Sequence, residues 1–195
     1  MKDCDIRGAL WTRLEQQNAS DPDAKLFDEL GLCEGKVRID LAVVNGSLDG
    51  YEIKSDQDTL GRLDAQQRLY SKVFDHVTIV SHGAHMARAI ERVPEWWGVT
   101  QAIGIGSDIV SFIDRRPAQQ NPSPDPLAIV KLLWREEVIA VLESRGIDRG
   151  VRSKTRRHAW KRAATSIPLP ELMAEVRDAL KLRSWRPLAP RRARA

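Results

Sequence analysis

A run of alternating apolar and polar or small residues at positions 36–44 constrains the fold of this chain more than any other feature. The apolar positions of this run are Val37, Ile39, Leu41 and Val43. A period of two is typical of a β-strand with one buried face. Asn45-Gly46 follows directly and favours a two-residue hairpin turn, because both residues accept positive φ. We therefore expect residues 48–54 to return as the antiparallel partner strand.

The segments around this hairpin predict an α/β domain. Residues 5–17 have the apolar spacing of a helix, and residues 25–32 are expected to form a strand, with a helical turn as the alternative. An amphipathic helix follows the hairpin from Asp58 to Phe74, and the β-branched run Val77–Val80 indicates a buried strand. The predicted order is helix, three strands, helix, strand, continued by a helix at 84–93 and strands at 99–105 and 108–113.

Two acids and a lysine occupy matching places on the predicted hairpin. A turn centred near residue 46 pairs Asp40 with Glu52, and Glu52 shares a face with Lys54 because residues two apart point the same way in a strand. Two carboxylates with a backbone carbonyl and waters form a hard-oxygen site suited to Mg²⁺ or Mn²⁺. A solvated salt bridge between Lys54 and one carboxylate is the alternative.

The pattern of these residues resembles the PD-(D/E)XK nuclease superfamily. Its core has the order predicted above, and its metal-binding acids and lysine correspond to Asp40, Glu52 and Lys54. Gln66 and Tyr70 match the QxxxY helix of the RecB-like branch. The motifs RxD, EIKSD and Trp-Trp-Gly, here at residues 38–40, 52–56 and 96–98, also resemble an uncharacterised bacterial family assigned to this superfamily. Ile39 stands where the superfamily's name-giving proline would be.

The resemblance implies roles for the site residues. Asp40, Glu52 and the carbonyl of Ile53 would bind Mg²⁺ or Mn²⁺, and Lys54 and Gln66 would complete the catalytic group. Some members add an acidic ligand upstream, for which Glu29 is favoured over Glu15 and Glu34. For each of these three residues, a solvated glutamate is an equal alternative. Tyr70 is expected either to take part in the functional site or to pack in the hydrophobic core.

Charge is divided unevenly along the chain. Residues 127–195 hold 17 of the 31 Lys and Arg residues but only 7 of the 27 Asp and Glu residues. A basic segment beside an acidic one is typical of a part that binds polyanions, and a merely solubilising tail is the alternative. The chain has no apolar run of membrane-spanning length and no secretory signal, so we expect a cytoplasmic protein.

The composition predicts a second, smaller domain. Residues 1–115 would form the nuclease-like domain, 116–126 a Pro-rich linker, 127–186 a basic helical domain, and 187–195 a basic tail. Helices are expected at 127–144 and 169–182, with a partly helical stretch at 149–162 between them. This arrangement resembles a SAP-type DNA-binding hairpin. Its expected nucleic-acid contacts are Arg149, Arg152, Lys154, Arg156, Arg157, Lys161 and Arg162.

These patterns together predict a metal-dependent nuclease that hydrolyses phosphodiester bonds of nucleic acid, with DNA as the favoured substrate and a homodimer as one possible assembly. One alternative is a catalytically inactive DNA-binding protein with the same fold. Another is an interaction protein whose basic helices dock on an acidic partner. Cys4 and Cys33 lack the spacing of a zinc site.

Overall fold

The computed structural model describes residues 2–55, 58, 60–83, 86–105 and 109–183. The first part of the chain forms α1 (Asp3–Gln17), β1 (Lys25–Leu32), β2 (Val37–Val44), β3 (Leu48–Lys54), α2 (Leu63–Tyr70), β4 (His76–His82), α3 (Met86–Arg92), β5 (Gly98–Ile105) and β6 (Ile109–Arg116). The second part forms α4 (Pro126–Val130), α5 (Arg135–Ser144), α6 (Arg156–Ser166) and α7 (Leu169–Leu182). Short 3-10 turns lie at Cys33–Gly35 and Leu60–Arg62. The expected basic tail, 187–195, falls outside the described residues.

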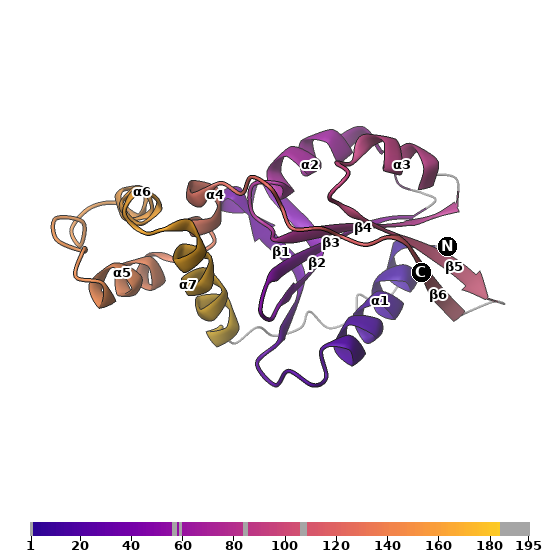
Figure 1. Ribbon diagram of the computed structural model, residues 1–195, viewed down its shortest axis with the longest axis horizontal. Coiled ribbons are helices and arrows are strands. Elements are labelled where there is room, and N and C mark those ends of the chain that lie inside the picture. The colour runs from indigo at the N-terminus through magenta and orange to yellow at the C-terminus, as the bar shows by residue number, and fades with distance from the viewer. Residues whose placement is uncertain (1, 56–57, 59, 84–85, 106–108, 184–195) are drawn as a thin grey trace, which may run out of the picture.

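The six strands form one mixed sheet in the order of the chain, β1-β2-β3-β4-β5-β6 (Figure 1). The first three strands and the last pair are antiparallel, whereas β3, β4 and β5 run parallel. The parallel pairs are joined by the crossover helices α2 and α3, because a parallel connection must return across a face of the sheet. The α/β class predicted from the sequence is confirmed.

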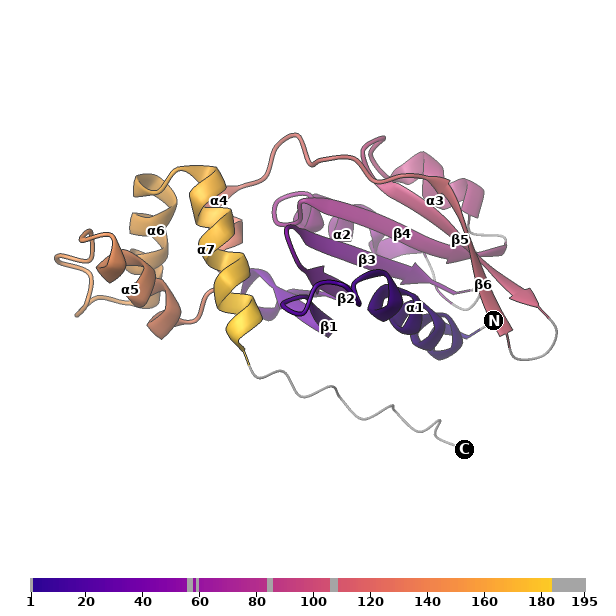
Figure 2. The same ribbon diagram turned by 60° about the horizontal axis from the view of Figure 1, so that its bottom comes forward.

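Helices cover the two faces of the sheet (Figures 1 and 2). On one face, α1 buries Ile6, Leu10 and Leu14 against the strand residues Leu41 and Ile53. On the other, α2, α3 and the turns that follow them bury a larger cluster around Tyr70, Phe74 and Trp97. The inner strands are therefore enclosed on both sides, as parallel strands usually are.

The register of the β2–β3 hairpin agrees with the prediction, but its turn does not. The ladder pairs Leu41 with Tyr51 and Val44 with Leu48, which centres the turn on Gly46. The turn has three residues, and Gly46 does not adopt positive φ, so the expected two-residue type is wrong. The Asn45 side chain instead accepts hydrogen bonds from the backbone N–H and hydroxyl of Ser47, which closes the turn locally.

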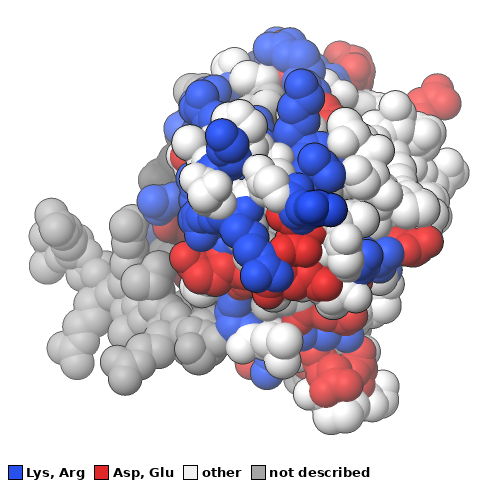
Figure 3. All heavy atoms as spheres, turned by 90° about the vertical axis from the view of Figure 1, so that its left-hand side faces the viewer, with Lys and Arg blue, Asp and Glu red and all other residues white. Residues whose placement is uncertain are grey.

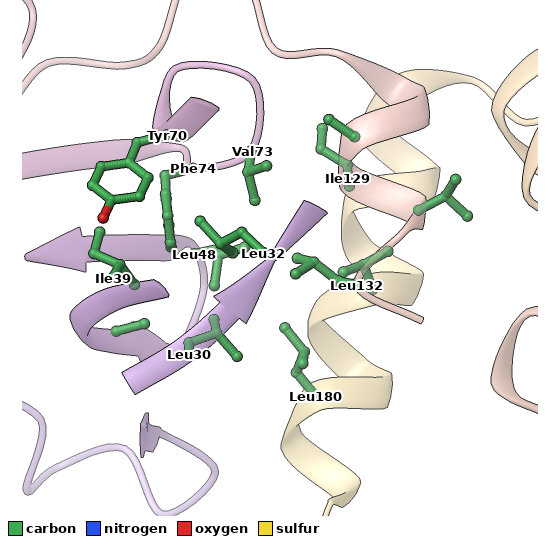
Figure 4. Packing of buried hydrophobic residues seen from close by; sticks show 14 of the residues in the cluster. Leu30, Leu32, Ile39, Leu48, Tyr70, Val73, Phe74, Ile129, Leu132 and Leu180 are labelled. Atoms are coloured by element: carbon green, nitrogen blue, oxygen red, sulfur yellow. The ribbon is translucent and has the colours of Figure 1, made fainter. Parts of the chain in front are cut away.

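The C-terminal helices pack against the β1 end of the sheet. Ile129, Leu132 and Leu180 join the same buried cluster as Leu30 and Leu48 (Figure 4). The helix expected at 127–144 is divided into α4 and α5. The α5 helix begins anew after Trp134, whose backbone N–H donates to the carboxylate of Glu137.

The Pro-rich segment between the sheet and α4 contains no helix or strand, yet its backbone is anchored. The side-chain amide of Asn121 donates to the carbonyls of Ser71 and Phe74, and the backbone N–H of Asn121 donates to the carbonyl of Asp75. These bonds satisfy carbonyls at the end of α2, which is shorter than predicted. None of the described helices is both long and apolar enough to cross a membrane.

Candidate functional site

The strands β1 and β2 are distorted at Asp40. Their ladder pairs Asp28 with Leu41 and Leu30 with Ile39, and it skips the pair between them. Glu29, opposite Asp40, has a φ of 54°. The pairing of β2 with β3 also ends at Leu41, one residue before Asp40 and Glu52 would meet. The strands separate here, so polar side chains occupy the space between them.

Asp40 reaches into this space toward β3. Its Oδ2 accepts a hydrogen bond of 2.7 Å from the backbone N–H of Ile53. This bond holds the Asp40 carboxylate beside the strand that carries Glu52 and Lys54. Asp40 is therefore joined to β3 by a side-chain bond, because the backbone ladder stops before Asp40 and Glu52 would pair.

Glu52 lies at the centre of a buried polar cluster and is only 2% exposed. Its Oε1 accepts from Lys54 Nζ at 2.5 Å and from Gln66 Nε2 at 2.6 Å. Lys54 also donates to Gln66 Oε1 at 3.2 Å. The helix α2 thus presents Gln66 and Tyr70, one turn apart, to the same carboxylate.

Tyr70 belongs to both the core and the site. It is fully buried, and its hydroxyl lies 2.8 Å from Glu52 Oε2 and 2.7 Å from the carbonyl oxygen of Arg38. The hydroxyl has one proton and the carbonyl only accepts, so a protonated Glu52 that donates to Tyr70 satisfies all three groups. The sequence left the role of Tyr70 open because helical spacing alone does not distinguish a core residue from a site residue.

The electrostatics of the cluster favour the protonated form of Glu52. Burial, followed by the nearby charge of Asp40, raises the pKa of Glu52 to about 7. Burial likewise raises the pKa of Asp40, against the opposing effect of Arg7. Two buried acids with raised pKa values are an arrangement that a bound cation would stabilise.

Arg7 is the site residue that sequence reasoning missed. Its Nη2 donates to Asp40 Oδ1 at 2.6 Å, and its Nη1 donates to Asp28 Oδ1 at 2.8 Å and to the Asp40 carbonyl at 3.0 Å. Burial is the largest single effect on Arg7 and lowers its pKa, but Asp40, Asp3 and Asp28 together outweigh burial and raise the pKa of the guanidinium. The only sequence signal was a lone arginine on the first helix, which indicates no partner.

The oxygens available to a metal are those of Asp40 and Glu52, with the carbonyl of Ile53 between them in sequence. No group of three His, Cys, Asp or Glu side chains suited to a metal occurs among the described residues. Glu29 is not joined to this pair by any hydrogen bond within the described part of the chain. Its carboxylate instead pairs with Arg38 at 3.2 Å. Asp28, its neighbour in β1, shares Arg7 with Asp40, as does Asp3 on α1.

A second candidate surface lies on α6 and the segment before it. All seven of the basic residues predicted to contact nucleic acid are exposed. Figure 3 views the end of the molecule that carries α5, α6 and α7, where Lys and Arg side chains gather above a band of acidic ones. Arg152 pairs with Asp148 and Glu143, and Arg156 stacks over Trp160 at 4.3 Å from the ring centroid. The other five lie beside fewer acids. Within the described residues, Arg149, Lys154, Lys161 and Arg162 have no carboxylate at ion-pair distance, and Arg157 lies 4.0 Å from Glu34.

Comparisons with known proteins place the chain in a phage protein family. Protein cII of Enterobacteria phage P4 is 39% identical over 79 residues, a segment that covers 40% of this chain and 30% of that protein. The aligned part is thus less than a third of the relative's length. No solved structure matches the chain. A family model described as bacteriophage P4 protein cII matches residues 2–186, so the chain belongs to the bacteriophage P4 protein cII family.

Proposed function

We propose that this protein is a metal-dependent nuclease of the PD-(D/E)XK type. The observation that carries the proposal is that Asp40 is bonded to the backbone N–H of Ile53, the residue between Glu52 and Lys54, while Lys54 is bonded to the buried Glu52. Gln66 and Tyr70 support the same carboxylate from α2. A buried salt bridge needs further hydrogen bonds, which Gln66 and Tyr70 supply, but it does not need a second buried acid such as Asp40 beside it.

The order of elements supports the same proposal. From α1 to β4 the chain runs helix, three antiparallel strands, helix and a strand parallel to the third. This order is the one expected of a restriction-endonuclease-like core, and it therefore supports the proposal. The acids lie where the pairing of β2 with β3 stops, near the carboxyl end of β3, which runs parallel to β4. Open α/β sheets commonly bind ligands at the carboxyl ends of their strands.

The donor set fits Mg²⁺ or Mn²⁺. Asp40, Glu52 and the Ile53 carbonyl supply hard oxygens, and such ions take their remaining ligands from water and phosphate. When bound, the metal would lower the pKa of a water molecule and neutralise charge on the phosphate. Arg7 competes for Asp40, so occupancy of the site requires the guanidinium to give up its bond to Oδ1.

The chain's own residues have distinct tasks in this proposal. Lys54 positions the attacking water and contacts the scissile phosphate, because its ammonium group is held beside Glu52. Gln66 and Tyr70 hold Glu52 in its orientation. The exposed basic residues of α6 and of the segment before it bind phosphates of the nucleic acid without regard to sequence, and DNA is the favoured substrate.

The test is cleavage of duplex DNA with Mg²⁺ or Mn²⁺ by the full chain and matched variants. Asp40→Asn and Lys54→Met preserve side-chain size and are expected to lower the cleavage rate by about a hundredfold or more. Lys25→Met, an exposed lysine at the start of β1, is the control and should cleave like the wild type. Circular dichroism checks that each variant is folded. Unchanged cleavage by both site variants would remove the assignment.

One observation favours a second candidate, a DNA-binding protein that retains the nuclease fold without activity. Arg7 already pairs with Asp40 and Lys54 with Glu52, so each acid has a cationic partner without a metal ion. This candidate predicts salt-sensitive DNA binding with no cleavage in Mg²⁺ or Mn²⁺. It also predicts that Asp40→Asn binds DNA as well as the wild type does.

A further inference from the structure

Ser81 on β4 carries a buried hydroxyl that has no partner in the described part of the chain. The residue is 0% exposed, and its Oγ has no hydrogen-bond partner among the described residues. Ser81 pairs in register with Lys54 of β3. It lies two residues after Ile79, whose side chain packs in the cluster beneath α2 and α3, so the hydroxyl is on the same face as Glu52 and Lys54.

The neighbours of Ser81 in the sheet direct their polar groups elsewhere. Lys54 uses two N–H bonds for Glu52 and Gln66, which leaves its third N–H without a partner among the described residues. Gln101, the register partner of Ser81 on β5, accepts two bonds from Arg115 at its Oε1. Among the residues that the structure describes, one hydroxyl and one ammonium N–H therefore stay without a partner at paired positions of β4 and β3.

We propose that Ser81 and Lys54 together bind a non-bridging oxygen of the substrate phosphodiester, an inference that rests on the nuclease proposed above. A hydroxyl and an ammonium group both donate, and an anionic oxygen accepts from both. A buried polar group without a partner destabilises the folded state, so such groups are rare unless they have a functional partner. Ser81 is a phosphate-binding residue in this assignment, and it takes no part in bond breaking.

The first test separates function from stability through Ser81→Ala. Removal of the hydroxyl is expected to lower kcat about tenfold, the effect of one hydrogen bond removed from the transition state. The same variant should unfold at the wild-type temperature or above it, because it removes an unsatisfied buried group. Ser111→Ala is the control, since Ser111 lies on the same face of β6 but is partly exposed. A lower unfolding temperature for Ser81→Ala would show that the fold satisfies the hydroxyl, and would overturn the proposal.

The second test uses inorganic phosphate alone, without DNA or a divalent ion. Phosphate should raise the unfolding temperature of the wild type by more than that of Ser81→Ala, at matched ionic strength with chloride. The Ser111→Ala control should respond like the wild type. Equal responses of all three proteins would overturn the proposal.

The two tests distinguish failure of this proposal from failure of the nuclease assignment. Cleavage by the wild type with an equal rate for Ser81→Ala leaves the nuclease in place and rejects the role of Ser81. Absence of wild-type cleavage rejects the nuclease. In that case the phosphate response alone decides whether Ser81 and Lys54 bind an anion.

Discussion

Replacement of Arg7 by glutamine tests the charge balance of the candidate site. The substitution keeps a side chain that can donate hydrogen bonds but removes the positive charge between Asp40 and Asp28. In the wild type, Arg7 contacts these two acids at 2.6 and 2.8 Å, and its own side chain is 21% exposed. The metal-free variant therefore leaves two partly buried carboxylates without their cation.

The expected loss of stability follows from this burial. Breaking a fully buried ion pair costs about 3–5 kcal/mol, whereas an exposed pair contributes about 0–1 kcal/mol. The intermediate exposure of Arg7 and Asp40 points to about 2 kcal/mol. For a chain of this length, each kcal/mol lowers the unfolding temperature by about 2–4 °C, so Arg7→Gln should unfold about 4–8 °C below the wild type.

Added Mg²⁺ or Mn²⁺ should recover more stability in the variant than in the wild type. The guanidinium competes with a metal for Asp40, and its removal strengthens metal binding to the folded state. Thermal unfolding followed by tryptophan fluorescence, with and without the ion, measures both effects. Arg13→Gln on the same helix is the matched control, because its partner Asp114 is 56% exposed. An Arg7→Gln variant as stable as the wild type, and equally insensitive to the metal, would refute this reasoning.

Three further predictions concern pH, packing and the basic surface. The pKa of Glu52 is about 7 in the fold against an ordinary 4.5, so the folded state holds the proton more strongly. Metal-free stability should therefore fall as pH rises from about 4.5 to about 7, and urea unfolding of Glu52→Gln should lose this dependence. Gly50→Ala would place a Cβ 2.5 Å from Ile39 Cδ1 and 3.1 Å from the ring of Phe74. Because these buried side chains must shift to make room, the variant should be about 1–3 kcal/mol less stable in urea unfolding. The double variant Lys161→Glu with Arg162→Glu should bind DNA more weakly. The slope of log Kd against log salt concentration should fall by about 1 for each phosphate that the protein no longer neutralises. The control Lys25→Glu should change neither the affinity nor the slope. Binding of the double variant that matches the wild type at every salt concentration would exclude α6 from the interface.

Local patterns were sufficient to predict the strands and the register of the hairpin. The alternation at 36–44 specified a strand, and the register followed from the position of the Asn45-Gly46 turn, which centres the hairpin on Gly46. The turn type was not predictable in the same way. The Asn45 side chain and Ser47 close a three-residue turn, and this bond depends on side-chain geometry that the Asn-Gly pattern does not contain.

The surroundings of the acids could not be predicted from sequence. Arg7 is 33 residues from Asp40, and no local pattern relates a helix residue to a strand residue at that separation. Asp28, rather than the predicted Glu29, is joined to the site through Arg7 because the β1–β2 ladder is irregular at this point. The unsatisfied hydroxyl of Ser81 also depends on how its neighbours on β3 and β5 direct their side chains.

The sequence by itself determined the α/β class, the hairpin register and the basic character of the last third of the chain, because periodicity and charge are properties of neighbouring residues. Only the tertiary structure decided which partners surround Glu52 and Asp40, and that the C-terminal helices share the core of the sheet. Those contacts join residues far apart in the chain, and their selection depends on packing and on the satisfaction of buried polar groups throughout the fold.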